Sequence, residues 1–234
     1  ISIGRLPILI KSFFYFLIPA VLVLMQPDLG TTIILFAIWL GFLLVSGLPW
    51  RYIFVGLAIF SLVVAMVWSS IEYCSKEERQ SSQICSKIFK KYQRNRIIAL
   101  FNPNYSPLGV NYNVIQSKIA IGSAGFFGKG FQQGTQVQLG FLPEAATDFV
   151  LAALIEEWGL VGGLAAIAAF ALIIFRILKI GLFSGNNFSS FICLGAVIMF
   201  LIQFTINVGS TVGLLPVIGV TFPFLSYGGS SILI

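Results

Sequence analysis

Three carboxylates stand where the surrounding residues are apolar. Asp148 directly precedes a long apolar run, and Glu156 and Glu157 interrupt it. An ionised side chain in lipid costs several kcal/mol, so these groups are expected to face protein or a wet cavity. Asp148 follows Thr147, a good N-cap residue, which predicts Asp148 in the first turn of a helix, where the helix dipole favours the ionised form. Such a carboxylate at a membrane edge suits a general base.

The two glutamates also have a structural interpretation. On a helix, Glu156 lies about 12 Å deeper than Asp148, and Glu157 points to the opposite face. A buried, hydrogen-bonded role that braces the helix is therefore predicted for both, with a chemical role as the alternative. For Asp148 a catalytic role is the first interpretation, and a structural role is the alternative.

The residue inventory excludes several kinds of site. The sequence has no His and three Cys, which excludes Ser-His-Asp and Cys-His arrangements and most zinc sites. It also has no phosphate-binding GxxxxGK[ST] loop. Cys74 and Cys85 could form a disulfide in an oxidising compartment or stay as two thiols, while Cys193 is expected to pack inside a span.

A further carboxylate, Asp28, lies in the stretch QPDLGTT. Pro27 to Gly30 has the residue types of a tight turn, and Asp28 could cap the helix that follows. A functional role at the membrane edge is equally open at this point. Spacing alone does not choose between them.

Composition predicts the elements that must position these residues. Hydrophobic residues make up 58% of the 234 positions and charged residues 9%, and the mean hydropathy is +0.97, which is typical of a membrane protein. The predicted fold class is all-α, a polytopic transmembrane helix bundle. The chain reads as part of a larger protein, with a truncated sixth span beginning at 229. Five full spans are predicted, at residues 6–25, 29–48, 52–71, 149–175 and 188–206.

Cations in the short connections predict the orientation. Arg5, Lys11, Arg51, Arg176 and Lys179 fall on one side of these alternating spans, which is then cytoplasmic. The chain accordingly divides into transmembrane helices, a large extracytoplasmic loop, and further transmembrane helices with a Gly- and Pro-rich outer loop that suits a wall around a lipid tail. The boundaries are 1–71, 72–147 and 148–234, with the outer loop at 207–231.

The loop 72–147 has two parts. Residues 87–96 are rich in cations and contain no acid, which suits an anionic partner or a solvated face near anionic headgroups. Residues 121–130, IGSAGFFGKG, are too short to span and too apolar for a free linker. A membrane-edge or re-entrant segment is expected there.

Four motifs in sequence carry a resemblance over nearly the whole chain. The chain resembles the shape, elongation, division and sporulation (SEDS) family of bacterial cell-wall polymerases, and its rod-shape (RodA-like) branch more than the division branch. That family is implied to have about ten transmembrane helices, of which this chain would hold the fifth onward. Gly140 replaces a Glu of many relatives, and residues 73–91 form a longer link than usual. The motifs are QPDLGTT, YQRNRIIALFNPNYSPLGVNYNVIQSKIAIGSAGFFGKG, GTQVQLGFLPEAATDFVLAALIEEWGLVG and NVGSTVGLLPVIGVTFPFLSYGGSS.

The resemblance implies an inverting peptidoglycan glycosyltransferase that polymerises lipid II at the outer face of the bacterial cytoplasmic membrane for cell elongation and shape. The family's catalytic Asp in the TDF motif falls on Asp148, the implied general base. The pyrophosphate leaving group needs charge neutralisation, from cations or from a divalent metal such as Mg or Mn. The candidate substrate contacts are Asp28, Arg94, Arg96, Lys118, Lys129 and Glu144.

The implied partners are lipid II, undecaprenyl-pyrophosphate-linked glycan, a class B penicillin-binding protein and the elongation machinery, with no nucleic acid. A lipid II flippase or transporter is the alternative function. A transporter is expected to place its site near the midplane between inverted repeats, and no internal repeat is visible. A membrane scaffold without required outer carboxylates is a third possibility.

Overall fold

The computed structural model describes most of the chain on both sides of the long loop. All regular secondary structure among the described residues is helical, which agrees with the predicted all-α class. Most of the predicted span 52–71, both loop cysteines Cys74 and Cys85, and both Arg94 and Arg96 lie outside the described residues. The described residues are 6–26, 28–46, 49, 51–52, 58, 61–62, 65–66, 69, 109 and 111–227.

The first two helices lie close to their predicted positions. Helix α1 spans Leu6–Met25 and α2 spans Leu29–Val45. The two helices pack through aromatic side chains, with the ring of Phe16 stacked on that of Trp39 at a centroid distance of 5.2 Å. This pairing joins the second half of α2 to α1.

Helices α8 and α9 are longer than predicted. Helix α8 spans Val150–Phe183 and α9 spans Asn187–Val212, and both are long and apolar enough to cross a membrane by length and composition. Arg176 and Lys179, expected after the fourth span, therefore lie within the last turns of α8. Both cations are exposed, so the helix continues through them without burying charge.

The outer loop predicted from 207 begins later than expected. Helix α9 continues through Asn207 and ends where Gly213 adopts a left-handed conformation, φ 75° and ψ 29°. The prediction was wrong because the polar residues near 207 look like a loop in sequence. In the fold they are buried, and the hydroxyls of Ser210 and Thr211 donate to the carbonyl of Asn207, at 2.9 and 2.8 Å.

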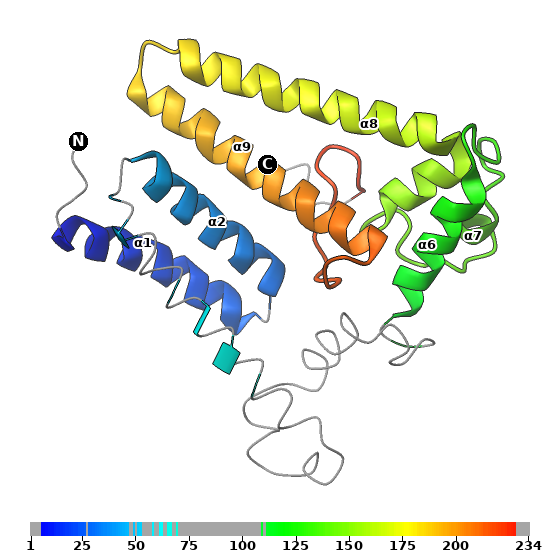
Figure 1. Ribbon diagram of the computed structural model, residues 1–234, viewed down its shortest axis with the longest axis horizontal. Helices are drawn as coiled ribbons and strands as arrows, with labels where there is room; N and C mark the ends of the chain where they lie inside the picture. The colour runs from blue at the N-terminus through cyan, green and yellow to red at the C-terminus, as the bar shows by residue number, and fades with distance from the viewer. Residues whose placement is uncertain are drawn as a thin grey trace, which may run out of the picture.

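Figure 1 shows α1, α2, α9 and α8 side by side in that order. Helices α6 (Tyr112–Ala124) and α7 (Thr135–Gln138) cover the first part of α8. Buried aromatic rings join α8, α9 and the last segment of the chain: Phe170 stacks on Phe204 at 4.6 Å, and Phe222 meets Phe204 edge-on at 5.4 Å. The middle of α8, the second half of α9 and the last described segment are thereby held together.

Helix α8 is broken at Gly159, whose φ of 74° and ψ of −174° are not helical. The break frees backbone groups, and residues 125–130 bond to them. Lys129 N donates to the carbonyl of Glu156 at 2.9 Å, and Leu160 N donates to the carbonyl of Gly125 at 3.1 Å. A Cβ on Gly159 would lie 2.2 Å from the carbonyl oxygen of Phe126. The irregular backbone of IGSAGFFGKG is therefore satisfied by protein, as membrane depth would require.

Candidate functional site

Asp148 lies in the turn that leads into α8 and is half-buried. The N-cap of α8 is Phe149, so the prediction that Thr147 caps this helix was wrong. The Thr147 hydroxyl instead donates to the carboxylate of Glu144, at 2.9 Å. Phe149 is fully buried and anchors the start of the helix. Asp148 consequently precedes the first helical turn instead of lying within it.

The turn that carries Asp148 is tied to the last described part of the chain. Three consecutive carbonyls, those of residues 146–148, each accept a hydrogen bond from α9 or from the loop that follows it. The donors are Tyr227 N to Ala146 O at 2.8 Å, Ser226 Oγ to Thr147 O at 2.6 Å, and Asn207 Nδ2 to Asp148 O at 2.8 Å. The outer loop predicted as a wall is thus bonded directly to the candidate site.

Asp28 is the N-cap of α2. Its carboxylate accepts from Thr31 N at 3.0 Å and from Thr31 Oγ1 at 2.6 Å. The capping role left open by the sequence is therefore confirmed. The side chain of Asp28 is also exposed, and a contact with substrate stays a prediction.

The structure brings Asp28 and Asp148 to the same short segment, residues 218–220. A Cβ added at Gly219 would lie 3.9 Å from Oδ2 of Asp148. A Cβ added at Gly30, two residues after Asp28, would lie 2.8 Å from Cγ2 of Val220 and 3.5 Å from Oδ1 of Asp28. The two carboxylates thus border one stretch of the outer loop, although their positions in sequence are far apart.

A groove of about 350 Å³ runs from Asp28 along α2 and α9. Its polar lining residues besides Asp28 are Thr31 and Thr221, together with Gln203 on α9. The other lining positions on the two helices are apolar. They are Ile34, Leu35 and Ile38 on α2 and Met199 and Phe200 on α9. The groove is therefore mostly apolar along the two helices, with Asp28 in its lining and Asp148 beside Gly219 of that lining.

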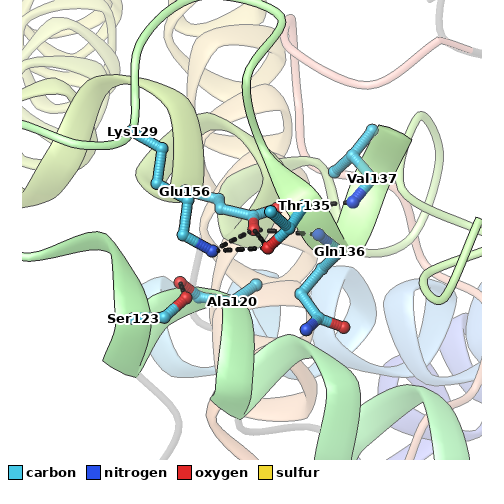
Figure 2. Close-up of polar contacts among 7 residues, drawn as sticks. All are labelled: Ala120, Ser123, Lys129, Thr135, Gln136, Val137 and Glu156. Atoms are coloured by element: carbon cyan, nitrogen blue, oxygen red, sulfur yellow. Dashed lines mark hydrogen bonds and ion pairs between the residues drawn. The ribbon is translucent and has the colours of Figure 1, made fainter. Parts of the chain in front are cut away.

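Glu156 is fully buried and held by several donors, as Figure 2 shows. Its carboxylate accepts from Lys129 Nζ at 2.7 Å, from Gln136 N at 2.9 Å and from Thr135 Oγ1 at 3.2 Å. These bonds agree with the predicted bracing role of Glu156, because the carboxylate fastens Lys129 and the first residues of α7 to α8. The charge of Lys129 is compensated by Glu156, and a contact of Lys129 with substrate stays a prediction.

The other candidate residues lie around this core. Lys118 is exposed, and its ammonium lies over the C-terminal turn of α9, 2.6 Å from where a Cβ of Gly213 would stand. A cation is favourable at that helix end. Glu144 is exposed beside Thr147, and Glu157 is half-buried beside a hollow that also touches Ala146. Within the described ranges, no group of three or more His, Cys, Asp or Glu could hold a metal ion, and the divalent cation stays a prediction.

Sequence reasoning missed Asn207 and Ser226. Both side chains are buried and bond to the turn of Asp148. Asn207 was assigned to a loop, where a polar residue needs no explanation. The signal for Asn207 in the sequence was its position directly after the apolar run 188–206. A polar residue in or beside a membrane span often marks a functional position.

Comparisons with known proteins agree on one family. A family model described as "Cell cycle protein" (FTSW_RODA_SPOVE) matches residues 4–234. Peptidoglycan glycosyltransferase MrdB of Escherichia coli (strain K12) is 40% identical over 92% of this chain and 54% of its own length. Peptidoglycan glycosyltransferase RodA of Treponema pallidum (strain Nichols) is 30% identical over 92% of this chain and 62% of its own length.

A division protein and a solved structure are similar as well. The probable peptidoglycan glycosyltransferase FtsW of Trichlorobacter lovleyi is 36% identical over 91% of this chain and 51% of its own length. A chain from a solved structure described as "Structural coordination of polymerization and crosslinking by a peptidoglycan synthase complex" has a TM-score of 0.73 and 31% identity, covering 100% of this chain and 60% of that one. The chain spans about half the length of the curated relatives it matches.

Proposed function

Because the chain belongs to the FtsW/RodA/SpoVE family, the SEDS family that its motifs resemble, we propose that the protein polymerises lipid II into glycan strands. The reaction takes place at the outer face of the bacterial cytoplasmic membrane and serves cell elongation and shape. Two relatives named as peptidoglycan glycosyltransferases, MrdB and RodA, support the activity and the RodA-like branch.

The observation that carries this proposal is the groove beside Asp28 and Asp148. A lipid-linked sugar needs an apolar channel for its tail and a polar mouth for its head. The groove offers both: apolar positions of α2 and α9 line most of it, Asp28 belongs to its lining, and the Asp148 carboxylate lies beside Gly219 of that lining. Chemistry at this mouth keeps the sugars at the membrane edge while the tails stay in an apolar environment.

Asp148 acts as the general base. The 4-hydroxyl of the acceptor N-acetylglucosamine attacks the anomeric carbon of N-acetylmuramic acid at the lipid end of the growing strand. As the new glycosidic bond forms, the hydroxyl proton passes to the Asp148 carboxylate, and general-base help of this kind is typically worth about 10²–10⁴-fold in rate. The bond to undecaprenyl pyrophosphate breaks on the opposite face, its electron pair leaves with the pyrophosphate oxygen, and the α linkage becomes β.

Cations of the stretch 72–147 favour departure of the pyrophosphate. Lys118 is exposed on α6, and Arg94 and Arg96 precede that helix in sequence. Lys129 joins this set only if substrate competes with its ion pair to Glu156. Neutralisation of the developing negative charge lowers the barrier more than a proton would, because pyrophosphate is already a good leaving group.

The membrane arrangement follows from the two ends of the bundle. Lys11, Arg176 and Lys179 lie at the end opposite to Asp148, which supports a multi-pass protein with that end in the cytoplasm and the active site facing the periplasm or exterior. A class B penicillin-binding protein is the proposed partner, alongside the elongation machinery. The similar chain comes from a complex described by polymerisation and crosslinking together, which supports this pairing.

Purified full-length protein with its transpeptidase partner tests the function. Labelled lipid II is expected to become long glycan strands on a gel, and the product should lose its reducing-end lipid on mild acid treatment. The same protein in sealed vesicles separates the transporter alternative. Passage of lipid II across the bilayer without any polymer would replace the polymerase proposal with that alternative.

A further inference from the structure

Asn207 is the residue that joins the Asp148 turn to the rest of the fold. It is fully buried in α9. Its side-chain amide donates both hydrogens, one to the carbonyl of Asp148 and one to the carbonyl of Val220, each at 2.8 Å. Val220 adjoins Gly219, whose backbone lies beside the Asp148 carboxylate. One side chain therefore connects α9, the proposed base and the segment that faces it.

We propose that Asn207, supported by Ser226, is a positioning residue for Asp148. The inference rests on the proposed function, in which Asp148 takes a proton from the acceptor sugar. Asp148 precedes the N-cap of α8, so helix geometry alone does not set where its carboxylate stands. The hydrogen bond to its carbonyl fixes the backbone from which the carboxylate projects, and misplacement of a reacting group by about 1 Å can cost about 10²-fold in rate.

The choice of asparagine supports this role. Its Oδ1 is buried and has no hydrogen-bond partner among the described residues, and such an orphaned acceptor destabilises a fold. An apolar side chain of similar size would avoid that cost. Unlike an apolar residue, asparagine supplies two N–H donors, which reach the carbonyl oxygens of Asp148 and Val220. An aspartate at this position would place negatively charged oxygens next to those carbonyl oxygens, and they would repel each other.

Ser226 holds the preceding residue of the same turn. Its hydroxyl donates to the carbonyl of Thr147 at 2.6 Å and accepts from Phe222 N at 2.8 Å. Phe222 is itself buried against the aromatic rings of α8 and α9. The two side chains thus anchor adjacent carbonyls of the Asp148 turn to the packed core, from two separate elements.

The same helix provides a matched control. Thr211 is as deeply buried as Asn207 and lies one turn further along α9. Its hydroxyl donates only within the helix, to the carbonyl of Asn207 at 2.8 Å. Thr211→Val therefore removes a buried polar group of α9 without removing a side-chain bond to the Asp148 turn.

The test uses full-length protein with its partner, and measures kcat and KM for lipid II per folded molecule, with the folded fraction taken from size exclusion. Asn207→Leu is expected to lower kcat by about 30-fold to 100-fold with KM changed by less than about threefold. Thr211→Val is expected to keep kcat within about twofold of the parent, because no bond to the turn is lost. Unchanged kcat in Asn207→Leu would overturn the inference.

A second arm separates positioning from general structural damage. In an Asp148→Asn background, Asn207→Leu is expected to cause no further loss of rate, because a residue that works through Asp148 has nothing left to position. A full additional loss in that background would refute the inference. If Asn207→Leu cannot be recovered folded, Ser226→Ala is measured in the same two backgrounds, with an expected kcat loss of about fivefold that vanishes beside Asp148→Asn.

The outcomes distinguish the inference from the proposed function. Parental activity in Asp148→Asn would show that Asp148 is not the general base, whatever the effect of substitutions at Asn207. Strong loss in Asp148→Asn together with parental kcat in both Asn207→Leu and Ser226→Ala would leave the function standing and sink only the positioning role.

Discussion

Two acidic residues near the start of α8 differ in where the described hydrogen bonds reach them. At Glu156 the donors reach the carboxylate itself, from Lys129, Thr135 and the backbone of residues 136 and 137. At Asp148 the described bonds from α9 and the outer loop reach the backbone carbonyls of the turn. The first arrangement fastens two segments through a charge. The second fixes a backbone whose half-buried side chain lies beside a segment of the groove.

The difference shows how neighbouring acidic residues can take different roles. A carboxylate that accepts several hydrogen bonds, including one from a partly buried ammonium, is stabilised as a permanent part of the fold. Hydrogen bonds to the backbone of the Asp148 turn fix the place of the residue relative to the groove, which suits a carboxylate that acts on a substrate. We call Glu156 and the residues that donate to its carboxylate the Glu156 brace. Substitutions in this brace are expected to lower the stability of the fold. Substitutions in the Asp148 turn are expected to lower the reaction rate.

The largest effect is expected from Asp148→Asn. The amide keeps the size and much of the hydrogen-bonding capacity but loses the basicity, so polymerisation of lipid II should fall by about two or more orders of magnitude. Loss of a helix-end interaction alone would cost at most about 1–2 kcal/mol of stability. The check is the rate of strand formation per folded molecule, with expression and partner binding measured alongside. Near-parental polymerisation would make Asp148 structural, like Glu156.

Gly159→Ala should be the most destabilising change near the brace. Its Cβ would meet the backbone of residues 126 and 128 at 2.2–2.4 Å, and its φ of 74° disfavours any side chain. We expect a loss of about 3 kcal/mol or more, seen as a collapse of folded yield. Gly122→Ala on α6 is the control, because its Cβ would meet nothing within 4 Å. That control should be neutral or stabilising by about 0.5–1 kcal/mol. A folded, stable Gly159→Ala protein would contradict the close contact between Gly159 and the backbone of residues 126 and 128.

Lys129→Met sharpens the comparison at the brace itself. It leaves the fully buried Glu156 carboxylate without its cation, and the loss of one partner of a buried pair costs about 3–5 kcal/mol. Because the Lys129 side chain is 23% exposed and other donors remain, about 2 kcal/mol is the expected loss, read from the melting temperature in detergent. Lys129→Met with Glu156→Gln should recover part of it. A normal melting temperature combined with a large loss of rate would instead place Lys129 at the substrate.

The smallest effect is expected at Asp28. Asn is as good an N-cap as Asp, so Asp28→Asn should change stability by less than about 0.5 kcal/mol, whereas Asp28→Ala should cost about 1 kcal/mol. If Asp28 also contacts substrate, Asp28→Asn should raise KM by about tenfold, which corresponds to about 1.4 kcal/mol of binding. Parental KM in Asp28→Asn, with the stability loss confined to Asp28→Ala, would reduce Asp28 to its capping role.

Much of this protein was predictable from local sequence because the membrane imposes a simple pattern. Apolar runs identified α1 and α2 almost to their ends, and a charge inside an apolar run marked Glu156 as a bracing residue. The motif around Asp148 pointed to the candidate base. These features depend on the solvent around a residue and on its chain neighbours, and both can be read along the sequence.

Only the tertiary structure decided how these parts meet. Asn207 and Asp148 are 59 residues apart in sequence, and no local periodicity relates them. The break at Gly159 depends on residues 125–130 crossing it, and Thr147 turns to Glu144 because the helix starts at the buried Phe149. Hydropathy and propensity report whether a residue suits lipid or a helix. They do not report which distant donor reaches a given carbonyl, because that follows from the packing of the whole bundle.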